Sequence, residues 1–459
     1  MQATTAALDD PTRLDAEGRP TVALPLGQLI RLSLYWLGLS SIFSGVQDIL
    51  TGRLQFTGLV ERGSEGAAVF QMTVFGTVIA MLVQPTIGTI SDYTQTRWGR
   101  RKPYILIGSL LDVVFLYGIA TSNTVVAIAA FFVLLQFSSN FAQGPFQGYV
   151  PDLVPARQVG LASALVGLFQ VLGNVTGFAI AAVALFFSET VPDAFLLGTM
   201  ALGLVELATM LSVLVGVREG RTAKDRGGRS WLAIAREAWG TDILRERSFL
   251  WLVGSRLLVL MGSSMLVQLS TFYLAQSHAL DAQATASVKI ALLALVTASI
   301  VLSVVPSARA SDRFGRKPVI YVSCAVGTVG LLLVAAAPVL AVAFVGAALV
   351  GVSSGIFLAV DWALMTDIIP KASSGRYMGL SNVATASAGI LAVAFGAGLI
   401  MDSVNSLVGY GIGPRAAMLF GAGSFVLGAL LLIPVDERRR AEAPAADGAS
   451  EDVPARRSS

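Results

Sequence analysis

The sequence has little charge for its length. Charged residues make up 13% of the 459 residues and apolar residues 54%, whereas about 25% of the residues in a soluble domain are charged. Mostly apolar runs recur along the whole chain, and each is close to the roughly 20 residues that an α-helix needs to cross a bilayer. We therefore predict an all-α membrane protein with many spans, not a globule with one large core.

Cysteine and histidine are almost absent. Cys324 is the only cysteine and lies in an apolar run, which excludes a disulfide framework and a thiol metal site. The only histidine, His278, falls in a predicted external loop, where we expect it to be solvated. We expect no cofactor and no metal. The net charge of +3 comes from cations in membrane-flanking loops, so we expect no nucleic acid partner.

Several functional motifs are missing as well. The phosphate-binding pattern G-x-x-x-x-G-K-[ST] does not occur, which argues against an ATP-driven pump. No set of nucleophile, base and acid assembles in the sequence, so we expect no enzyme. The polar N-terminus lacks the basic and then apolar order of a secretory signal peptide. We expect the first span to serve as an uncleaved insertion signal.

The apolar runs predict twelve transmembrane helices in two groups of six. The charged stretch 218–247 separates the groups, and we interpret it as a cytoplasmic linker between an N-terminal half, 25–217, and a C-terminal half, 248–435. The polar segments 1–24 and 436–459 read as disordered cytoplasmic tails. The predicted spans are 28–50, 68–90, 103–122, 125–149, 159–187, 193–217, 248–276, 286–309, 317–338, 340–368, 376–401 and 412–434.

The basic residues predict the orientation of these spans. With both termini in the cytoplasm, 27 of the 32 Lys and Arg residues fall on the cytoplasmic side. Lys289 and Arg53 are among the few assigned to the outside. Because basic loops stay in the cytoplasm, we expect a multi-pass protein of the cytoplasmic membrane, embedded in the lipid bilayer with both ends inside.

Two landmarks recur in the second half of the chain. The basic loop Gly88 to Pro103 reappears in shortened form as SDRFGRKP at Ser311 to Pro318. Asp152 recurs 215 positions later as Asp367, together with a nearby proline and glycine. Two landmarks at a similar offset indicate a duplicated six-helix unit, and such a repeat predicts a substrate site between the halves near the bilayer midplane.

Polar side chains follow single faces of several predicted spans, most clearly spans one, four and five. Two interpretations stay open: the side chains line a shared polar cavity, or they hold helices together by hydrogen bonds. We favour a cavity for these three spans together. The substrate-cavity candidates are Trp36, Ser44, Gln47, Asn140, Gln143, Gln147, Gln170, Asn174, Gln268 and Asn382.

Ionisable residues within the spans are candidates for proton coupling. A charge at membrane depth costs about 2.5–3.5 kcal/mol and needs a partner or a wet cavity. Arg256 and Asp361 lie at similar depths and are expected to pair, either as a structural lock or as a functional group. Asp48 has the alternative of lying near the outer surface. The proton-coupling candidates are Asp48, Asp112, Glu206, Arg256 and Asp361.

The basic loop resembles the loop 2–3 motif of the major facilitator superfamily. Its four-residue insertion, Thr94 to Arg97, is similar to the extended form in sucrose–proton symporters, the glycoside–cation branch of that family. The segments AQGPFQGYVPDLVP and LGNVTGF also resemble that branch. The resemblance covers about residues 83–180, and the branch's arginine in the first of these segments falls on Gln147 here.

This resemblance implies a major facilitator fold and a cytoplasmic gate. Asp92 is then expected to meet the N-terminal end of span 11, which starts near Arg376, and so to favour the outward-open state. The second copy of the loop is expected to meet span 5 in the same way. The gate-motif candidates are Gly88, Asp92, Gly99, Arg100, Arg101, Asp152, Asp312, Arg313, Gly315, Arg316 and Asp367.

Three functional hypotheses follow. The first is a secondary active transporter, acting as a monomer by alternating access, that takes up a sugar, glycoside or similar small polar solute with protons. The second is an exporter of drug-like compounds by proton antiport. The third is a non-transporting membrane protein that assembles pigment complexes, because relatives of that kind belong to the same general group.

Overall fold

The computed structural model describes residues 21–94, 96–217, 219, 228, 230, 231, 247–368, 385 and 387–435. Twelve helices in this part of the chain are long and apolar enough to cross a membrane. These helices confirm the predicted all-α architecture. Their bounds are α2 Leu26–Phe56, α3 Glu65–Asp92, α4 Lys102–Thr121, α5 Val125–Gln147 with α6 Tyr149–Leu153, α7 Val159–Phe186, α8 Ala194–Gly216, α10 Arg247–Phe272 with η4 Tyr273–Ser277, α11 Ala282–Phe314, α12 Arg316–Ala336, α13 Leu340–Ile368, a span Ser387–Leu407 that contains η6 Ala394–Met401 and α15 Asp402–Leu407, and α16 Gly413–Leu432.

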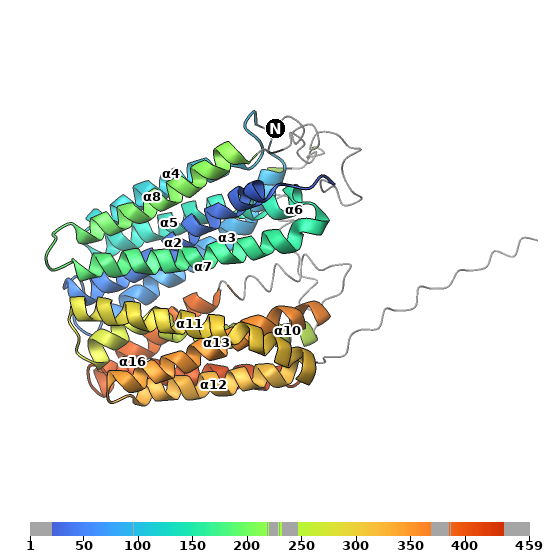
Figure 1. Ribbon diagram of the computed structural model, residues 1–459. Coiled ribbons are helices and arrows are strands. Elements are labelled where there is room, and N and C mark those ends of the chain that lie inside the picture. The colour runs from blue at the N-terminus through green and yellow to red at the C-terminus, as the bar shows by residue number, and fades with distance from the viewer. Residues whose placement is uncertain are drawn as a thin grey trace, which may run out of the picture.

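The helices lie side by side in two groups (Figure 1). In the first group α2 packs on α7 and α8, and α5 packs on α3 and α4. In the second group α13 packs on α11 and α12, and α16 packs on α10 and α12. Large apolar side chains such as Val215, Leu204 and Leu302 are exposed on the outside of these groups, as expected for surfaces that face lipid. The division of the chain at residues 218–247 stays a prediction, because most of that segment lies outside the described residues.

Small residues allow the closest helix crossings. A Cβ atom at Gly144 of α5 would lie 2.3 Å from the carbonyl oxygen of Gln84 in α3, and one at Gly177 of α7 would lie 2.4 Å from the carbonyl oxygen of Ser41 in α2. Such spacing is typical of membrane helices, where contact between backbones replaces the hydrophobic driving force of water.

Several pairs of elements in the described part of the chain connect the two groups. The helix α3 contacts η6, α7 contacts α11, and α2 contacts α10. We use "predicted external end" for the end of the molecule that carries the loops 57–64, 278–281 and 408–412, and "predicted cytoplasmic end" for the end that carries the basic loop.

Two helices are longer than the apolar runs predict, and this corrects the position of two cations. The helix α11 begins at Ala282, because the side chain of Asp281 caps it by accepting a hydrogen bond from the backbone N–H of Ala284. Lys289 therefore lies one to two turns inside the helix and is 1% exposed. Likewise α2 continues to Phe56 and buries Arg53, whose guanidinium group donates to the carbonyl oxygens of Ile119 and Ser122. Both cations are therefore buried within helices and do not lie in loops, while the side of the membrane on which they lie stays a prediction.

Candidate functional site

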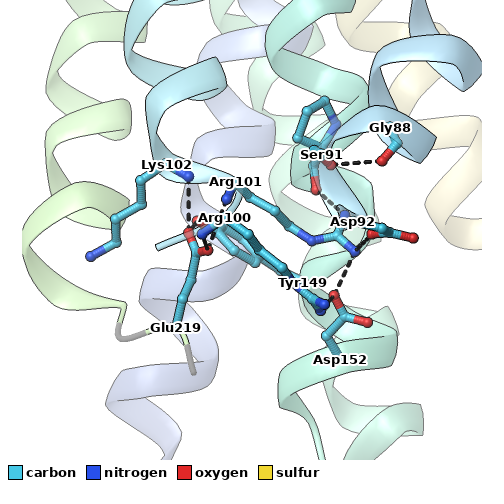
Figure 2. Close-up of polar contacts among 10 residues, drawn as sticks. Gly88, Ser91, Asp92, Arg100, Arg101, Lys102, Tyr149, Asp152 and Glu219 are labelled. Atoms are coloured by element: carbon cyan, nitrogen blue, oxygen red, sulfur yellow. Dashed lines mark hydrogen bonds and ion pairs between the residues drawn. The ribbon is translucent and has the colours of Figure 1, made fainter. Parts of the chain in front are cut away.

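The basic loop forms an ordered polar network at the predicted cytoplasmic end (Figure 2). The guanidinium group of Arg101 lies between two carboxylates, with Nη2 2.7 Å from Asp92 Oδ1 and 2.5 Å from Asp152 Oδ2. Arg100 forms a second ion pair with Asp152. The side chain of Arg101 is only 6% exposed, so water screens these pairs weakly. The network joins the ends of α3, α4 and α6.

A break in the fourth span supplies another acceptor for Arg101. Pro145 ends the regular hydrogen bonding of α5, and the chain restarts as α6 at Tyr149. The carbonyl oxygen of Pro145 accepts a hydrogen bond from Arg101 Nη1 at 2.6 Å. A Cβ atom at Gly148 would lie 1.8 Å from the same nitrogen, so a larger residue at the break would displace the Arg101 side chain from this position.

Glu219, just past α8, binds the start of α4. Its carboxylate accepts hydrogen bonds from the backbone N–H groups of Arg100, Arg101 and Lys102, at 2.7, 2.8 and 2.9 Å. The hydroxyl of Tyr149 donates to it at 2.5 Å. A helix start leaves N–H groups unpaired and carries partial positive charge, and Glu219 satisfies both needs. The first stretch of the predicted linker is therefore attached to the gate motif.

The second copy of the loop also contains an ion pair in its described part. Arg316 donates to Asp312 Oδ1 at 2.8 Å and to the hydroxyl of Ser311 at 2.6 Å. The side chain of Asp312 is 70% exposed, and Gly315 has the positive φ angle, 93°, that a glycine adopts without strain. The side chain of Asp367 lies outside the described residues, and so does Arg376. The expected contact between Asp92 and span 11 therefore stays a prediction.

Two buried carboxyl groups lie close together inside the first half. Ser138 and Ser139 of α5 donate to Asp112, and the hydroxyl of Tyr35 in α2 donates to Glu206 at 3.0 Å. Both carboxyl groups are 0% exposed, and the hydroxyl of Tyr35 also lies 2.6 Å from that of Ser109 in α4, the helix that carries Asp112. Whether either carboxyl group carries the transported proton stays a prediction.

The expected pairing of Arg256 with Asp361 is present. The two side chains form an ion pair between α10 and α13, and each is 3% exposed. The guanidinium group also donates to the hydroxyl of Thr385 at 2.8 Å. This ion pair lies within the second half of the chain, and its role in coupling stays a prediction.

Asp48 lies in the contact between the two halves. It forms an ion pair with Lys289 of α11, whose ammonium group also donates to Thr271 of α10 at 2.8 Å. Thr271 donates in turn to Asp48 at 3.3 Å. Asp48 is therefore paired, and its side chain is largely buried at 8% exposure. Its depth relative to the outer surface of the membrane stays a prediction.

Further bonds between the halves surround this ion pair at the predicted external end. Asp402 accepts hydrogen bonds from the backbone N–H groups of Gly66 and Ala67, at 3.2 and 2.6 Å, in the first turn of α3. Gln55 bonds to both Gln276 and Tyr410. A cavity of about 450 Å³ opens beside them and is lined by both halves. In this conformation the predicted external end is closed.

The loop residue His278 is less solvated than expected. Its Nε2 atom lies 3.1 Å from the hydroxyl of Tyr273, and the two rings pack edge to face. Burial, and then the charge of Arg415, lower the pKa of His278 below its ordinary value. The histidine is thus packed against η4 and favours the neutral form.

The residues of the polar stripes were expected either to line a cavity or to bond helices together, and the structure supports bonding for some of them. Ser44 is buried and donates to the carbonyl oxygens of Ser40 and Asn174, and Asn140 is 3% exposed and donates to Gln136. These contacts favour helix-to-helix and local bonding for Ser44 and Asn140. Asn382 lies outside the described residues. The remaining candidates are half-buried or exposed and stay predictions: Trp36, Gln47, Gln143, Gln147, Gln170, Asn174 and Gln268.

A family model for the major facilitator superfamily matches residues 32–393 and also residues 283–457. The chain belongs to the major facilitator superfamily. This membership, with the twelve apolar helices, identifies a multi-pass membrane transporter.

Curated relatives of this superfamily member are plant sucrose transporters. The sucrose transport protein SUT1 of Oryza sativa subsp. japonica is 28% identical over 178 residues, which cover 34% of this chain and 32% of the relative. The sucrose transport protein SUC3 of Arabidopsis thaliana is 31% identical over 126 residues, which cover 22% and 21%. The similarity thus spans about a third or less of these relatives.

Solved structures of other superfamily members share the fold. A D-xylose–proton symporter superimposes with a TM-score of 0.62 at 15% identity, covering 89% of this chain and 97% of the symporter. The nucleoside transporter NupG gives a TM-score of 0.61 at 14% identity, covering 90% and 99%. At such identities the likeness shows the fold alone.

Several residues of these polar networks were not among the sequence candidates, and for two of them the sequence carries a signal. Glu219 has one available signal, an acidic residue directly after span six and opposite a basic loop. Lys289 has another, an N-capping Asp281 that starts the helix four residues earlier than the apolar run. The partners of Glu219 lie 70 to 119 positions away, and Asp48 lies 241 positions from Lys289, so no local pattern identifies these contacts.

Proposed function

We propose that this protein takes up a sugar, a glycoside or a similar small polar solute together with protons, by alternating access. The observation that carries the proposal is the sequence similarity to two plant sucrose transport proteins. The closed contact between the halves at the predicted external end supports it, because alternating access requires an end that opens and closes.

The half-buried amides of the cavity candidates fit such a substrate. Gln143, Gln170 and Gln268 each offer a donor and an acceptor, and sugar hydroxyl groups need both. Binding through neutral amides at the interface of the halves suits an uncharged solute. We place the protein in the cytoplasmic membrane as a monomer, with both termini inside.

Buried carboxyl groups provide sites for the transported proton. Asp361 forms an ion pair with Arg256, and protonation of its carboxylate would release that bond. Asp112 and Glu206 are completely buried carboxyl groups, and a proton bound to either would be held inside the first half. Either site can bind a proton away from bulk water, which a symporter needs if ion flow is to be coupled to substrate.

Uptake of labelled sugars into proteoliposomes under an imposed pH gradient tests this function. We expect accumulation of at least one sugar that collapses when an ionophore removes the gradient, and no accumulation in protein-free liposomes. Uptake that ignores the gradient would contradict proton symport. Efflux of lipophilic dyes without sugar flux would support the exporter instead, and co-purification of pigment protein without any flux would support the assembly protein.

Substitution of the carboxyl groups identifies the coupling site. Asp361→Asn and Glu206→Gln are each expected to abolish accumulation against a gradient if that residue carries the transported proton, while downhill exchange of sugar continues. Normal accumulation in one variant would show that the substituted residue does not carry the transported proton.

A further inference from the structure

Among the described residues, two ion pairs are almost completely buried, and they differ in what they connect. Arg256 and Asp361 belong to the same half of the chain. Asp48 lies on α2 in the first half and Lys289 on α11 in the second, 241 positions apart. Only the second of these pairs must change its geometry when the halves move relative to each other.

The ammonium group of Lys289 lies where four helices meet. It pairs with Asp48 of α2, donates to Thr271 of α10 and lies 5.9 Å from the ring centroid of Phe178 in α7. A cation close to an aromatic face is stabilised by the ring. Two of the four helices come from each half, so this one side chain bonds to both sides of the interface.

Separation of the halves at this end exposes both charges or leaves them unpaired. A buried charge without its partner is strongly unfavourable, while a closed and dry interface strengthens the attraction between the two. The interface is therefore stable when the pair is formed, and it can open only when water or another polar group takes over the solvation of each charge.

We propose that Asp48 and Lys289 are functional residues of the transport cycle, forming an ion pair that holds the predicted external end closed and that breaks each time this end opens. The proposal rests on the alternating-access part of the proposed function. Lys289 then has a role in closing the predicted external end. Asp48 shares that role and differs in this from the carboxyl groups that are buried within one half.

Distances between spin labels test this gate without any substrate. Labels are attached to cysteines introduced at Glu61 and Ser406, exposed residues of the first and second halves at the predicted external end, in a Cys324→Ala background. The distance distribution is measured by double electron–electron resonance in lipid nanodiscs. When Asp48 and Lys289 are unchanged, we expect the labels to give mainly the short distance of the closed end.

Removal of either charge is expected to open this end. Asp48→Asn and Lys289→Gln should each raise the ratio of open to closed molecules by on the order of tenfold, a typical coupling between two conformational states. The exchanged pair Asp48→Lys with Lys289→Asp should restore most of the closed population. Arg53→Gln is the matched control, because Arg53 is a buried cation at the same end that bonds only within its own half; we expect no shift.

Distance distributions that stay unchanged in both single variants would overturn the proposal. If a single variant does not fold because it leaves a buried charge unpaired, the neutral double variant Asp48→Asn with Lys289→Gln serves instead. It should also shift toward the open form, and an unshifted distribution would count against the gate. A shift in distances without any sugar uptake would support the gate and contradict the proposed substrate and coupling.

Discussion

The two ends of the molecule use charge differently. At the predicted cytoplasmic end, Arg101 and Glu219 bond to groups of their own half. At the predicted external end, Lys289 and Asp402 bond to groups of the other half. The first arrangement makes a unit that stays assembled while the halves move, whereas the second makes an interface that has to form and break. Loss of a bond should therefore lower stability at one end and shift conformation at the other.

The largest expected effect is on Arg101. Arg101→Met removes the ion pairs with Asp92 and Asp152 and the bond to Pro145, so the free energy of unfolding should fall by about 3–5 kcal/mol. Thermal unfolding in detergent micelles measures it. Arg97→Met is the control, because Arg97 is an exposed cation of the same loop and should change the stability by less than about 0.5 kcal/mol. Equal losses in both variants would show that the network adds nothing.

A somewhat smaller effect is expected at Glu219. Glu219→Ala removes the acceptor of three backbone N–H groups and should cost about 2–3 kcal/mol of unfolding free energy, as for hydrogen bonds to a charged group. The corresponding change in the second copy of the loop, Asp312→Ala, removes only an exposed ion pair and should cost less than about 1 kcal/mol. The same unfolding assay compares the two, and equal costs would contradict the difference between the copies.

Substitutions at two closely packed glycines should affect different properties, the stability of the fold in one case and its conformation in the other. Gly144→Ala places a Cβ 2.3 Å from a carbonyl oxygen within one half and should lower the free energy of unfolding by about 1–3 kcal/mol. Gly66→Ala places a Cβ 2.1 Å from the carbonyl oxygen of Ala397 in the other half. It should open the predicted external end, seen as a longer distance between the spin labels, and leave the unfolding temperature nearly unchanged. Gly167→Ala, in open space, should do neither.

The smallest effect concerns His278. Because burial and Arg415 lower its pKa, the folded protein binds fewer protons there than the unfolded chain, and stability should fall as pH drops below about 6.5. The chain has one histidine, so its imidazole signal in a nuclear magnetic resonance titration can be assigned directly. We expect a midpoint below 6.5 that moves upward in Arg415→Gln. A midpoint at or above 6.5 in the unchanged protein would contradict this prediction.

The sequence predicted the fold well because spans are set by local hydrophobicity. The third span was expected at 103–122 and is Lys102–Thr121, since lipid tolerates few other arrangements of a long apolar run. Helix ends were less predictable. Both α2 and α11 extend past their apolar runs because Arg53 and Lys289 find partners inside the protein, and hydropathy counts such cations as loop residues.

The candidate site was predicted in part. The pairing of Arg256 with Asp361 followed from their similar depth, counted from the cytoplasmic ends of their two predicted spans. The contacts of Lys289 and Glu219 did not follow, since they depend on which helices meet in three dimensions. The two copies of the basic loop also look alike in sequence, yet only the first has an acidic residue of the described linker bound to it.

The carboxylate of Asp402 caps α3 from the opposite half of the chain. Each opening of the predicted external end would remove this cap and leave the amides of Gly66 and Ala67 to water. The rate of hydrogen–deuterium exchange at these two amides then reports how often the end opens. The protein thus carries its own conformational probe in the first turn of one helix, readable without labels and during transport.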